Sequence, residues 1–470
     1  MTDGRRVHRY GVMVCLLGQE RSKHVRSVSD GFAHPARIVP LAFLAAIVVG
    51  TVLLSLPYST PGPTRPPVLT AAFTTVSAVC VTGLTTVDTA TYWSPFGQTV
   101  IMALIQVGGF GIMTLATLLG MLVGGKLRLK SSLIAQAETH TLNIGDVRHV
   151  VRRVAITMLA FEVVFAAILT ARFRARYDDT WGDAVWHGVF HSISAFNNAG
   201  FALYSDNLIG FVADAWIMFP ICAAIIAGGI GFPVLFELRR RWRVPHQWTV
   251  HTRLTVYGSL ILLVAGIGAF LALEWSNEGT LGGLGPWGKV VGGVTGGVVP
   301  RTAGFNSIDY ANITPETMAV NYVLMFIGGG SGGTAGGIKV TTFFLLAFVI
   351  WSEVRGERDT NIAHRQIGSQ TLRQALTVVL LALAAIAVGT MMILLVTDYA
   401  LDVVLFETIS AFATVGLSTG ITPNLPPPAE ITLMVLMFVG RVGTITVASA
   451  LALKSRHRQF HLPEERPVIG

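Results

Sequence analysis

The chain has 470 residues, of which 52% are hydrophobic and 13% are charged, and its mean hydropathy is +0.61. Because soluble proteins carry about 25% charged residues, this composition excludes an ordinary soluble protein. The net charge of +8 is compatible with nucleic-acid binding. The basic residues are distributed as a membrane topology signal, however, so we expect no nucleic-acid partner.

Long apolar stretches recur along the chain. A membrane span needs about 17–25 predominantly apolar residues, and a helix satisfies its own backbone hydrogen bonds inside lipid. The stretches are residues 38–56, 96–123, 154–170, 211–236, 254–273, 376–396 and 431–453. We therefore expect an all-α integral membrane protein in the lipid bilayer of the cell membrane.

Lys and Arg residues alternate between rich and poor connections. They concentrate before residue 38, at 126–153, at 239–253, at 355–373 and after 453, and they are fewer in the connections between these clusters. Arg172, Arg174 and Arg176 form an exception that nearby aspartates partly offset. Because cytoplasmic loops carry the excess of Lys and Arg, we expect a multi-pass topology with both termini in the cytoplasm.

Four short segments repeat one pattern that ends in a glycine. Three of them begin with Phe-x-[Ser/Thr]-[Ile/Val]-Ser-Ala and the third is degenerate, and the terminal glycines lie 117, 104 and 112 residues apart. Such a repeat predicts four consecutive helix–pore-loop–helix units around a pseudo-four-fold pore. The units span residues 36–125, 150–240, 252–352 and 372–455, between a cytoplasmic arm at 1–35 and a cytoplasmic tail at 456–470.

The segments that end in these glycines, called the glycine loops below, are the predicted ion selectivity filter. Glycine accepts backbone angles that other residues resist, and loop carbonyls can replace the hydration shell of an ion. The side chains differ between copies, so backbone oxygens are the predicted ligands; the alternative is that the glycines only permit close helix packing. The four loops are Cys80, Val81, Thr82 and Gly83; Asn197, Asn198, Ala199 and Gly200; Arg301, Thr302, Ala303 and Gly304; and Ala413, Thr414, Val415 and Gly416.

Carboxylates follow three of the glycine loops. Asp88 and Asp309 stand five residues after the glycine and Asp206 six after, whereas the fourth repeat has Gly420 and Ile421 in this region. The acids form either an anionic mouth that concentrates cations or ordinary loop acids and helix caps, and the sequence leaves both readings open.

A glycine-rich run interrupts the second helix of the third unit, and we expect it to be a gate below the filter. Seven glycines in ten residues cannot hold a stable helix. Arg441 lies in the middle of the last apolar stretch, where a charge is expensive and needs a partner such as the freed loop carbonyls. The predicted gate residues are Gly328, Gly329, Gly330, Ser331, Gly332, Gly333, Thr334, Ala335, Gly336, Gly337, Lys339 and Arg441.

Other motifs give weaker signals. Residues 328–333 satisfy G-x-G-x-x-G, but a membrane helix precedes them instead of a βαβ unit, so a dinucleotide site is rejected. His187 and His191 could bind zinc, although pore-helix packing is favoured. Glu162 is either an ion or proton site or a structural carboxyl. No nucleophile–base pair or hydrolytic motif occurs, so we expect no enzyme, and the expected metal is K⁺ at the filter.

These features resemble the superfamily of K⁺ transporters that comprises TrkH, KtrB and the plant HKT proteins. The resemblance covers residues 36–455 and rests on the glycine loops, on 194–201 and 301–306, on the glycine-rich run and on Arg441. It implies that the filter glycines border K⁺ sites and that the broken helix and Arg441 gate the pore. Because no further helix pair precedes the first predicted span, the chain looks more like KtrB, the membrane subunit of the Ktr potassium uptake system, than TrkH.

The resemblance also implies partners and a function. The expected assembly is a homodimer with one pore per subunit, docked on a cytosolic RCK-type nucleotide-binding ring similar to KtrA. No cofactor is expected in this chain, the nucleotide belongs to the partner, and Na⁺ dependence is left open. The expected function is potassium uptake; the alternative is an ion-coupled secondary transporter of another solute, which inverted two-fold repeats would favour.

Overall fold

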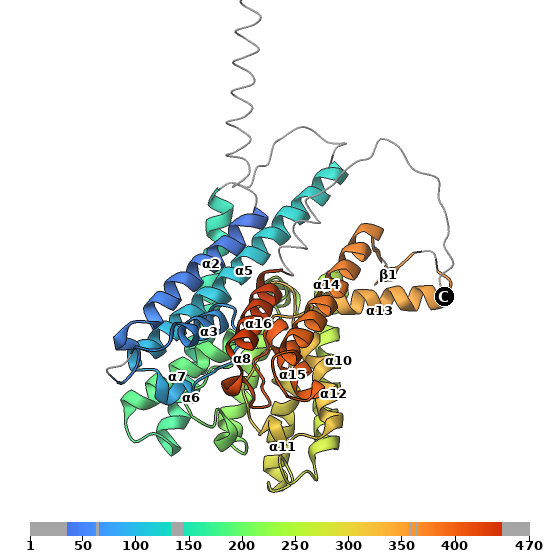
Figure 1. Cartoon of the computed structure of the whole chain (residues 1–470). Helices are drawn as coiled ribbons and strands as arrows, with labels where there is room; N and C mark the ends of the chain where they lie inside the picture. Colours follow the sequence, from blue (N-terminus) through green and yellow to red (C-terminus); the bar gives the residue numbers. More distant parts are fainter. Residues whose placement is uncertain (1–34, 63–64, 133–143, 358, 363–364, 444–470) are drawn as a thin grey trace, which may run out of the picture.

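Long helices and short pore helices alternate along the chain in the computed structural model, which describes residues 35–62, 65–132, 144–357, 359–362 and 365–443 (Figure 1). The predicted cytoplasmic arm before Pro35 and the predicted tail at 456–470 lie outside the described residues. The part of the last apolar stretch beyond Gly443 lies outside them as well.

Each repeat contains a first helix, a pore helix and a second helix. The first helices are α2 (Pro35–Leu54), α6 (Ile144–Arg176), α10 (Val250–Glu274) and α14 (Ser369–Leu394). The pore helices are α3 (Val68–Val79), α7 (Trp181–Phe196), α11 (Pro286–Val298) and α15 (Leu401–Phe412). The second helices are α5 (Pro95–Ser132), α8 (Ala215–Gly229) with α9 (Phe232–Arg241), α12 (Pro315–Phe326) with α13 (Val340–Val354), and α16 (Pro427–Phe438) with the π-helical turn η6 (Val439–Gly443).

Short elements join these helices. They are α4 (Thr89–Tyr92), the 3₁₀ turns η1 (Pro57–Ser59), η2 (Ile209–Phe211), η3 (Pro245–Gln247), η4 (Tyr310–Asn312) and η5 (Thr422–Asn424), and the antiparallel pair β1 (Asn361–Ile362) and β2 (Arg365–Gln366). Local chemistry sets several helix starts. Thr180, Thr249 and Thr314 are N-caps whose hydroxyls accept a backbone N–H from the first turn of α7, α10 and α12.

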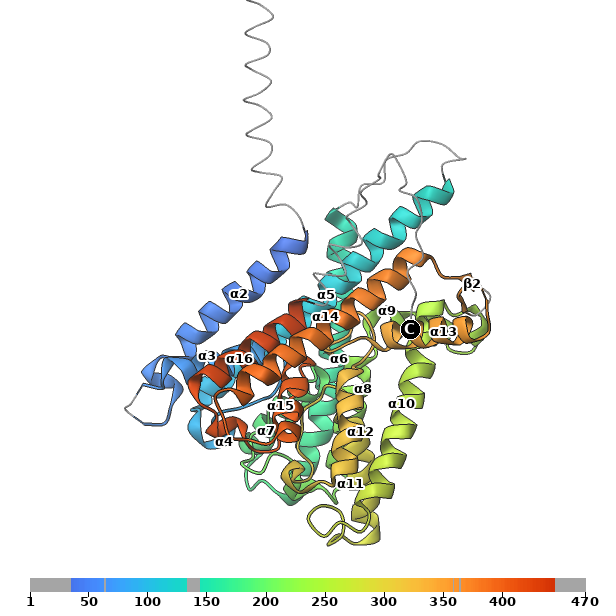
Figure 2. The same cartoon turned by 45° about the vertical axis from the view of Figure 1, so that its right-hand side comes forward.

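The repeats close into a ring. Each first helix packs on the pore helix of its own repeat, and each second helix packs on the pore helix of the next: α5 on α7, α8 on α11, α12 on α15, and α16 back on α3. Figure 2 shows α10 and α12 side by side, and α16 close to α3. The last repeat therefore returns to the first, which is the arrangement that a pseudo-four-fold axis requires.

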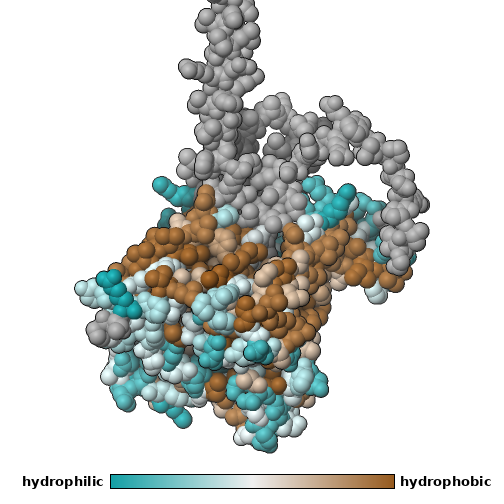
Figure 3. Space-filling model, in the orientation of Figure 1, coloured by the Kyte–Doolittle hydropathy of each residue, from teal (hydrophilic) through white to brown (hydrophobic). Residues whose placement is uncertain are grey.

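Apolar side chains cover the outside of the helices. A band of hydrophobic residues crosses the visible face of the molecule (Figure 3). Exposed Val48 on α2, Val163 on α6, Val264 on α10 and Leu380 on α14 contribute to such surface. Within the described residues, four helices are long and apolar enough to cross a bilayer, or five if α8 and α9 form one bent span. These helices face lipid on one side and the repeat core on the other.

The prediction of one continuous helix over 211–236 is wrong. The segment forms η2, then α8 and α9, and the last two meet at an angle of 99°. Gly231 adopts φ +96°, a conformation that glycine tolerates, and Pro233 is accepted as the second residue of α9 because a first-turn residue needs no backbone donor. The second repeat therefore has a broken second helix, as the third repeat does.

Candidate functional site

The four loop glycines meet in a closed ring. A Cβ atom added to Gly83 would lie 3.1 Å from the Cα of Gly200. One added to Gly200 would lie 2.9 Å from the Cα of Gly304, one on Gly304 3.0 Å from Gly416, and one on Gly416 3.0 Å from Gly83. Each glycine thus faces the backbone of the next repeat, and the ring leaves no space for side chains at these positions.

The glycine loops share an unusual backbone conformation. The glycines have φ of +96°, +71°, +68° and +92°, and the residues two positions earlier, Val81, Asn198, Thr302 and Thr414, have φ of 57°, 59°, 70° and 50°. The residue between each pair has negative φ. This alternation of positive and negative φ differs from the regular extended backbone of a strand. Positive φ at a β-branched residue costs about 1–3 kcal/mol, and such strain is characteristic of functional sites.

The serine of the repeated motif supports this conformation. The carbonyls of Ser77, Ser194 and Ser410 accept hydrogen bonds from the residue before each glycine, at 2.7–2.8 Å. The hydroxyls of Ser77 and Ser410 also accept from the N–H of Gly83 and Gly416, each at 3.1 Å. In the degenerate third copy Val298 replaces the serine, and Ala303 N–H donates instead to the Val299 carbonyl at 3.1 Å. The third loop therefore reaches the same geometry through a different bond.

The glycine-rich run at 328–337 lies against three of the four glycine loops. The Thr334 hydroxyl donates to the Phe196 carbonyl at 3.2 Å and to Asn198 Oδ1 at 3.1 Å. A Cβ added to Gly336 would lie 2.5 Å from the carbonyl oxygen of Ala413, and one on Gly328 would lie 3.2 Å from Thr302 Cγ2. The buried hydroxyls of Thr82 and Thr414 have no hydrogen-bond partner among the described residues. Both oxygens are therefore available to a ligand at the ring.

The break between α8 and α9 holds this run in place. Gly330 N–H donates to the Gly229 carbonyl at 2.8 Å, Thr334 N–H donates to Gly228 at 3.1 Å, and Phe232 N–H donates to Gly332 at 3.2 Å. Residues 228–231 were not among the predicted site residues. The signal was present, because Gly-Gly-Ile-Gly-Phe-Pro combines helix-breaking residues with a proline start.

Two buried arginines and the half-buried Lys339 surround the glycine-rich run. Arg441 Nη1 donates to the Thr334 carbonyl, and Lys339 Nζ donates to the Ala335 carbonyl at 2.5 Å. Arg301 Nη2 donates to the Gly328 carbonyl at 3.2 Å, and its Nη1 donates to the Ser259 carbonyl at 3.2 Å. No carboxylate forms an ion pair with these three within the part of the chain that the structure describes. A buried charge is costly, so these hydrogen bonds to carbonyls are needed to hold it.

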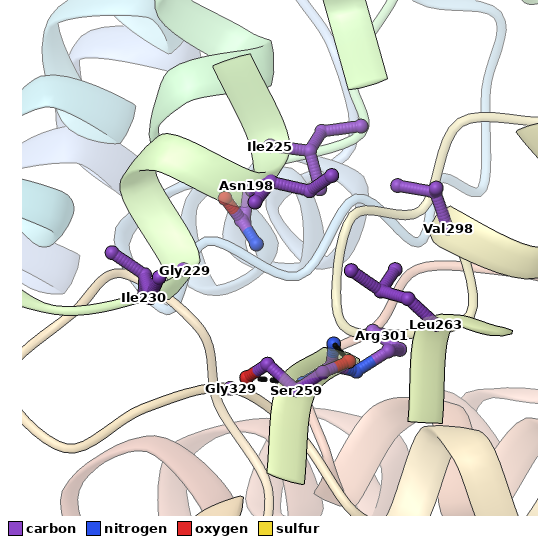
Figure 4. Close-up of a pocket in the computed structure, with 10 residues that line it drawn as sticks. Asn198, Ile225, Gly229, Ile230, Ser259, Leu263, Val298, Arg301 and Gly329 are labelled. Carbon is purple, nitrogen blue, oxygen red and sulfur yellow. Dashed lines mark hydrogen bonds between the residues drawn. The ribbon is translucent and has the colours of Figure 1, made fainter. Parts of the chain in front are cut away.

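Figure 4 shows how Arg301 lies relative to the second loop. Arg301 and Ser259 line one side of a small cavity of about 30 Å³, and Asn198 and Ile225 lie on the other side. The Arg301 side chain is therefore directed toward the first helix of its own repeat and the start of the glycine-rich run.

The loop acids after the glycines are engaged in caps and turns. Asp88 accepts from Ala90 N–H at 2.9 Å and from the Ser205 hydroxyl at 2.6 Å, and Asp309 accepts from Ala311 N–H at 3.0 Å. Partial burial acts to raise the pKa of Asp88, but these bonds and one from Thr91 outweigh burial and lower the pKa. In the fourth repeat, the buried Glu407 accepts from Thr419 N–H at 2.9 Å.

The histidine pair on α7 bonds to its surroundings. His191 Nδ1 lies 2.7 Å from the His187 carbonyl, and its Nε2 accepts from Leu203 N–H at 3.3 Å. His187 Nδ1 lies 3.0 Å from the Asp178 carboxylate. Both ring nitrogens of His191 are thus used in packing the pore helix. No group of three metal-ligating side chains occurs among the described residues.

Comparison with known proteins identifies the family of this chain. The model of the TrkH family, described as a cation transport protein, matches residues 5–253 and 285–459. The chain belongs to the TrkH family. The resemblance seen in the sequence is confirmed, and so is the all-α fold with four repeats.

Several relatives of this TrkH family protein are named as transport proteins. The Ktr system potassium uptake protein B of Bacillus subtilis (strain 168) is 38% identical and covers 93% of this chain and 97% of its own length. The potassium/sodium uptake protein NtpJ of Enterococcus hirae is 32% identical over 93% of this chain and 97% of its own. The crystal structure of the potassium transporter TrkH from Vibrio parahaemolyticus matches with a TM-score of 0.67 over 86% of this chain and 83% of that chain. At 18% identity, this match shows the fold alone.

Proposed function

We propose that this TrkH family protein mediates potassium uptake across the cell membrane through the ring of glycine loops. The closed ring carries the proposal, because all four repeats bring a loop with the same alternation of φ to it. We propose that this backbone presents its carbonyl oxygens to the ion. K⁺ loses its water to such carbonyls. A membrane potential that is negative inside supplies about 2.3 kcal/mol per charge for each 100 mV, so inward movement needs no hydrolysis in this chain.

The proposed gate is the glycine-rich run at 328–337. It packs below three glycine loops and bonds to the α8–α9 break, while Arg441 and Lys339 donate to its carbonyls. Seven glycines give the run little preference for one conformation, so two arrangements can differ by only a few kcal/mol. In the closed arrangement the run blocks the pathway, and the positive charges of Arg441 and Lys339 repel K⁺. In the open arrangement the run has moved aside.

The proposed regulator is a separate cytosolic protein. The helix α9 ends in three exposed arginines, Arg239, Arg240 and Arg241, and the exposed Arg243 follows it. The first residue of α9, Phe232, bonds to Gly332 of the run. A partner bound to these arginines would act on the gate through α9. The name of the Bacillus subtilis relative, which belongs to a Ktr system, supports a multi-component system. In it we expect a homodimer on an RCK-type nucleotide-binding ring. Both termini would face this ring in the cytoplasm.

Complementation tests the proposed function. A bacterium that lacks its own K⁺ uptake systems should grow at low external K⁺ when it expresses this chain with its regulator. Parallel cultures with and without Na⁺ determine whether transport depends on Na⁺; the relative NtpJ is named as a potassium/sodium uptake protein. Folded protein in the membrane without rescued growth or K⁺ uptake would contradict the proposal and favour transport of another solute.

A further inference from the structure

A buried carboxylate lies behind the second glycine loop. Glu162 is on α6, within a membrane-spanning segment, and its side chain is only 4% exposed. An ionisable residue at such a position is expensive and is a functional candidate by default. The proposed potassium pathway assigns it no role.

Glu162 forms a closed triangle with two amide side chains. Its Oε2 accepts from Gln106 Nε2 at 2.9 Å, and its Oε1 accepts from Asn197 Nδ2 at 3.1 Å. The third side joins the amides, because Asn197 Nδ2 also donates to Gln106 Oε1 at 3.0 Å. The three side chains come from the first helix of repeat two, the second helix of repeat one and the second glycine loop.

Only a side chain with two acceptors at position 162 satisfies this triangle. Asn197 presents one donor group to both neighbours, so Gln106 must turn its oxygen to Asn197 and its nitrogen to residue 162. An amide at position 162 would then place its nitrogen against the nitrogen of either Gln106 or Asn197. Flipping Asn197 would instead place its Oδ1 against the Oε1 of Gln106. The geometry therefore fits the ionised carboxylate of Glu162.

Asn197 connects this triangle to the ring. It caps the C-terminal end of α7 and is the first residue of the second glycine loop. Its neighbour Asn198 has φ of 59° and accepts the hydroxyl of Thr334 in the glycine-rich run. In repeat three the matching residue, Arg301, also bonds to the first helix of its own repeat, through Ser259. At both positions, three residues before the glycine, a side chain anchors the loop to an outer helix.

We infer that Glu162 is a positioning residue that fixes the second glycine loop through Asn197 and so helps to set the preference for K⁺ over Na⁺. The inference rests on the proposed potassium pathway. When residue 162 offers only one acceptor, Asn197 loses a hydrogen bond that holds it in place. The glycine loop that begins at Asn197 then relaxes from its strained conformation. A looser loop fits the smaller Na⁺ better relative to K⁺ than the wild-type loop does.

The test compares purified wild-type protein and Glu162→Gln in liposomes, with K⁺ and Na⁺ uptake measured per folded molecule. We expect the K⁺/Na⁺ uptake ratio to fall about tenfold, the factor that corresponds to ~1.4 kcal/mol. We also expect the KM for K⁺ to rise more than the maximum rate falls. Ser192→Ala is the matched control, because the Ser192 hydroxyl donates to the backbone carbonyl of Glu162 and not to its carboxylate. Its ratio should equal that of the wild type.

A double-mutant cycle tests whether Glu162 acts through Asn197. Glu162→Gln and Asn197→Ala should each lower the ratio, and the double variant should lower it no further. Additive effects, or an unchanged ratio in folded Glu162→Gln, would overturn the inference. If Glu162→Gln does not fold, Gln106→Ala opens two sides of the triangle without altering the carboxylate and must lower the ratio in the same direction. A wild-type protein that moves no K⁺ would instead refute the proposed function.

Discussion

Replacing Gly83 with serine should lower the preference for K⁺ over Na⁺ in this TrkH family protein. Gly83 has φ of +96°, and an added Cβ would collide with the carbonyl oxygen of Ala199 in the neighbouring glycine loop. Left-handed backbone costs a non-glycine residue about 1–2 kcal/mol. Because the obstacle is backbone, one of the two loops must also shift, and this shift moves carbonyls of the ring.

The expected size of the effect follows from this strain. Suppose that the loop relaxes to relieve about 1–2 kcal/mol of backbone strain. A change of this size in the difference between the binding free energies of K⁺ and Na⁺ alters the uptake ratio by about 5- to 30-fold. Gly304→Ser should act similarly, since its φ is +68° and its added Cβ would meet the Val415 carbonyl. Uptake of both ions is measured in the same liposomes and divided by the amount of folded protein.

Gly268→Ser is a matched control. Gly268 lies on the membrane helix α10, its φ is not positive, and nothing lies within 4 Å of an added Cβ. The same chemical change there should leave the ratio unchanged. An unaltered K⁺/Na⁺ ratio in well-folded Gly83→Ser and Gly304→Ser proteins would refute the argument that ring geometry controls selectivity.

Two further predictions concern the gate and the outer surface. Arg441→Gln should raise K⁺ flux per folded molecule at saturating K⁺, because it removes a charge and weakens the bond to Thr334; a folded variant with wild-type flux would contradict the gate. The pKa of Asp88 is lower in the folded protein than the value of about 3.9 in the unfolded chain. The hydrogen bonds of its carboxylate therefore stabilise the fold fully above about pH 3.9, and this stabilisation is lost as the pH falls through the folded-state pKa. Thermal unfolding midpoints should therefore fall less in Asp88→Asn than in wild type as the pH is lowered from about 5 to 2, and equal pH dependence would refute this role.

Local features of the fold were predictable from residue types. The apolar stretches predicted membrane helices because lipid imposes one length and one hydrogen-bonding solution. The recurring Phe-x-[Ser/Thr]-[Ile/Val]-Ser-Ala pattern predicted pore helices, and in three repeats the serine carbonyl holds the glycine loop. The bend at Gly229–Phe232 was not predicted, because mean hydropathy over 211–236 hid the glycines and proline that interrupt the helix.

The sequence by itself determined an all-α membrane protein with four like repeats and a glycine at the end of each pore segment, since composition and local backbone preferences suffice for both. Only the tertiary structure decided how these parts meet. The glycines form a ring through positions more than 100 residues apart, and Arg441 reaches Thr334 across 107 residues. Glu162 likewise finds its partners on two other segments, 56 and 35 residues away. Contacts between distant segments depend on packing of the whole ring, and no local pattern in the chain encodes them.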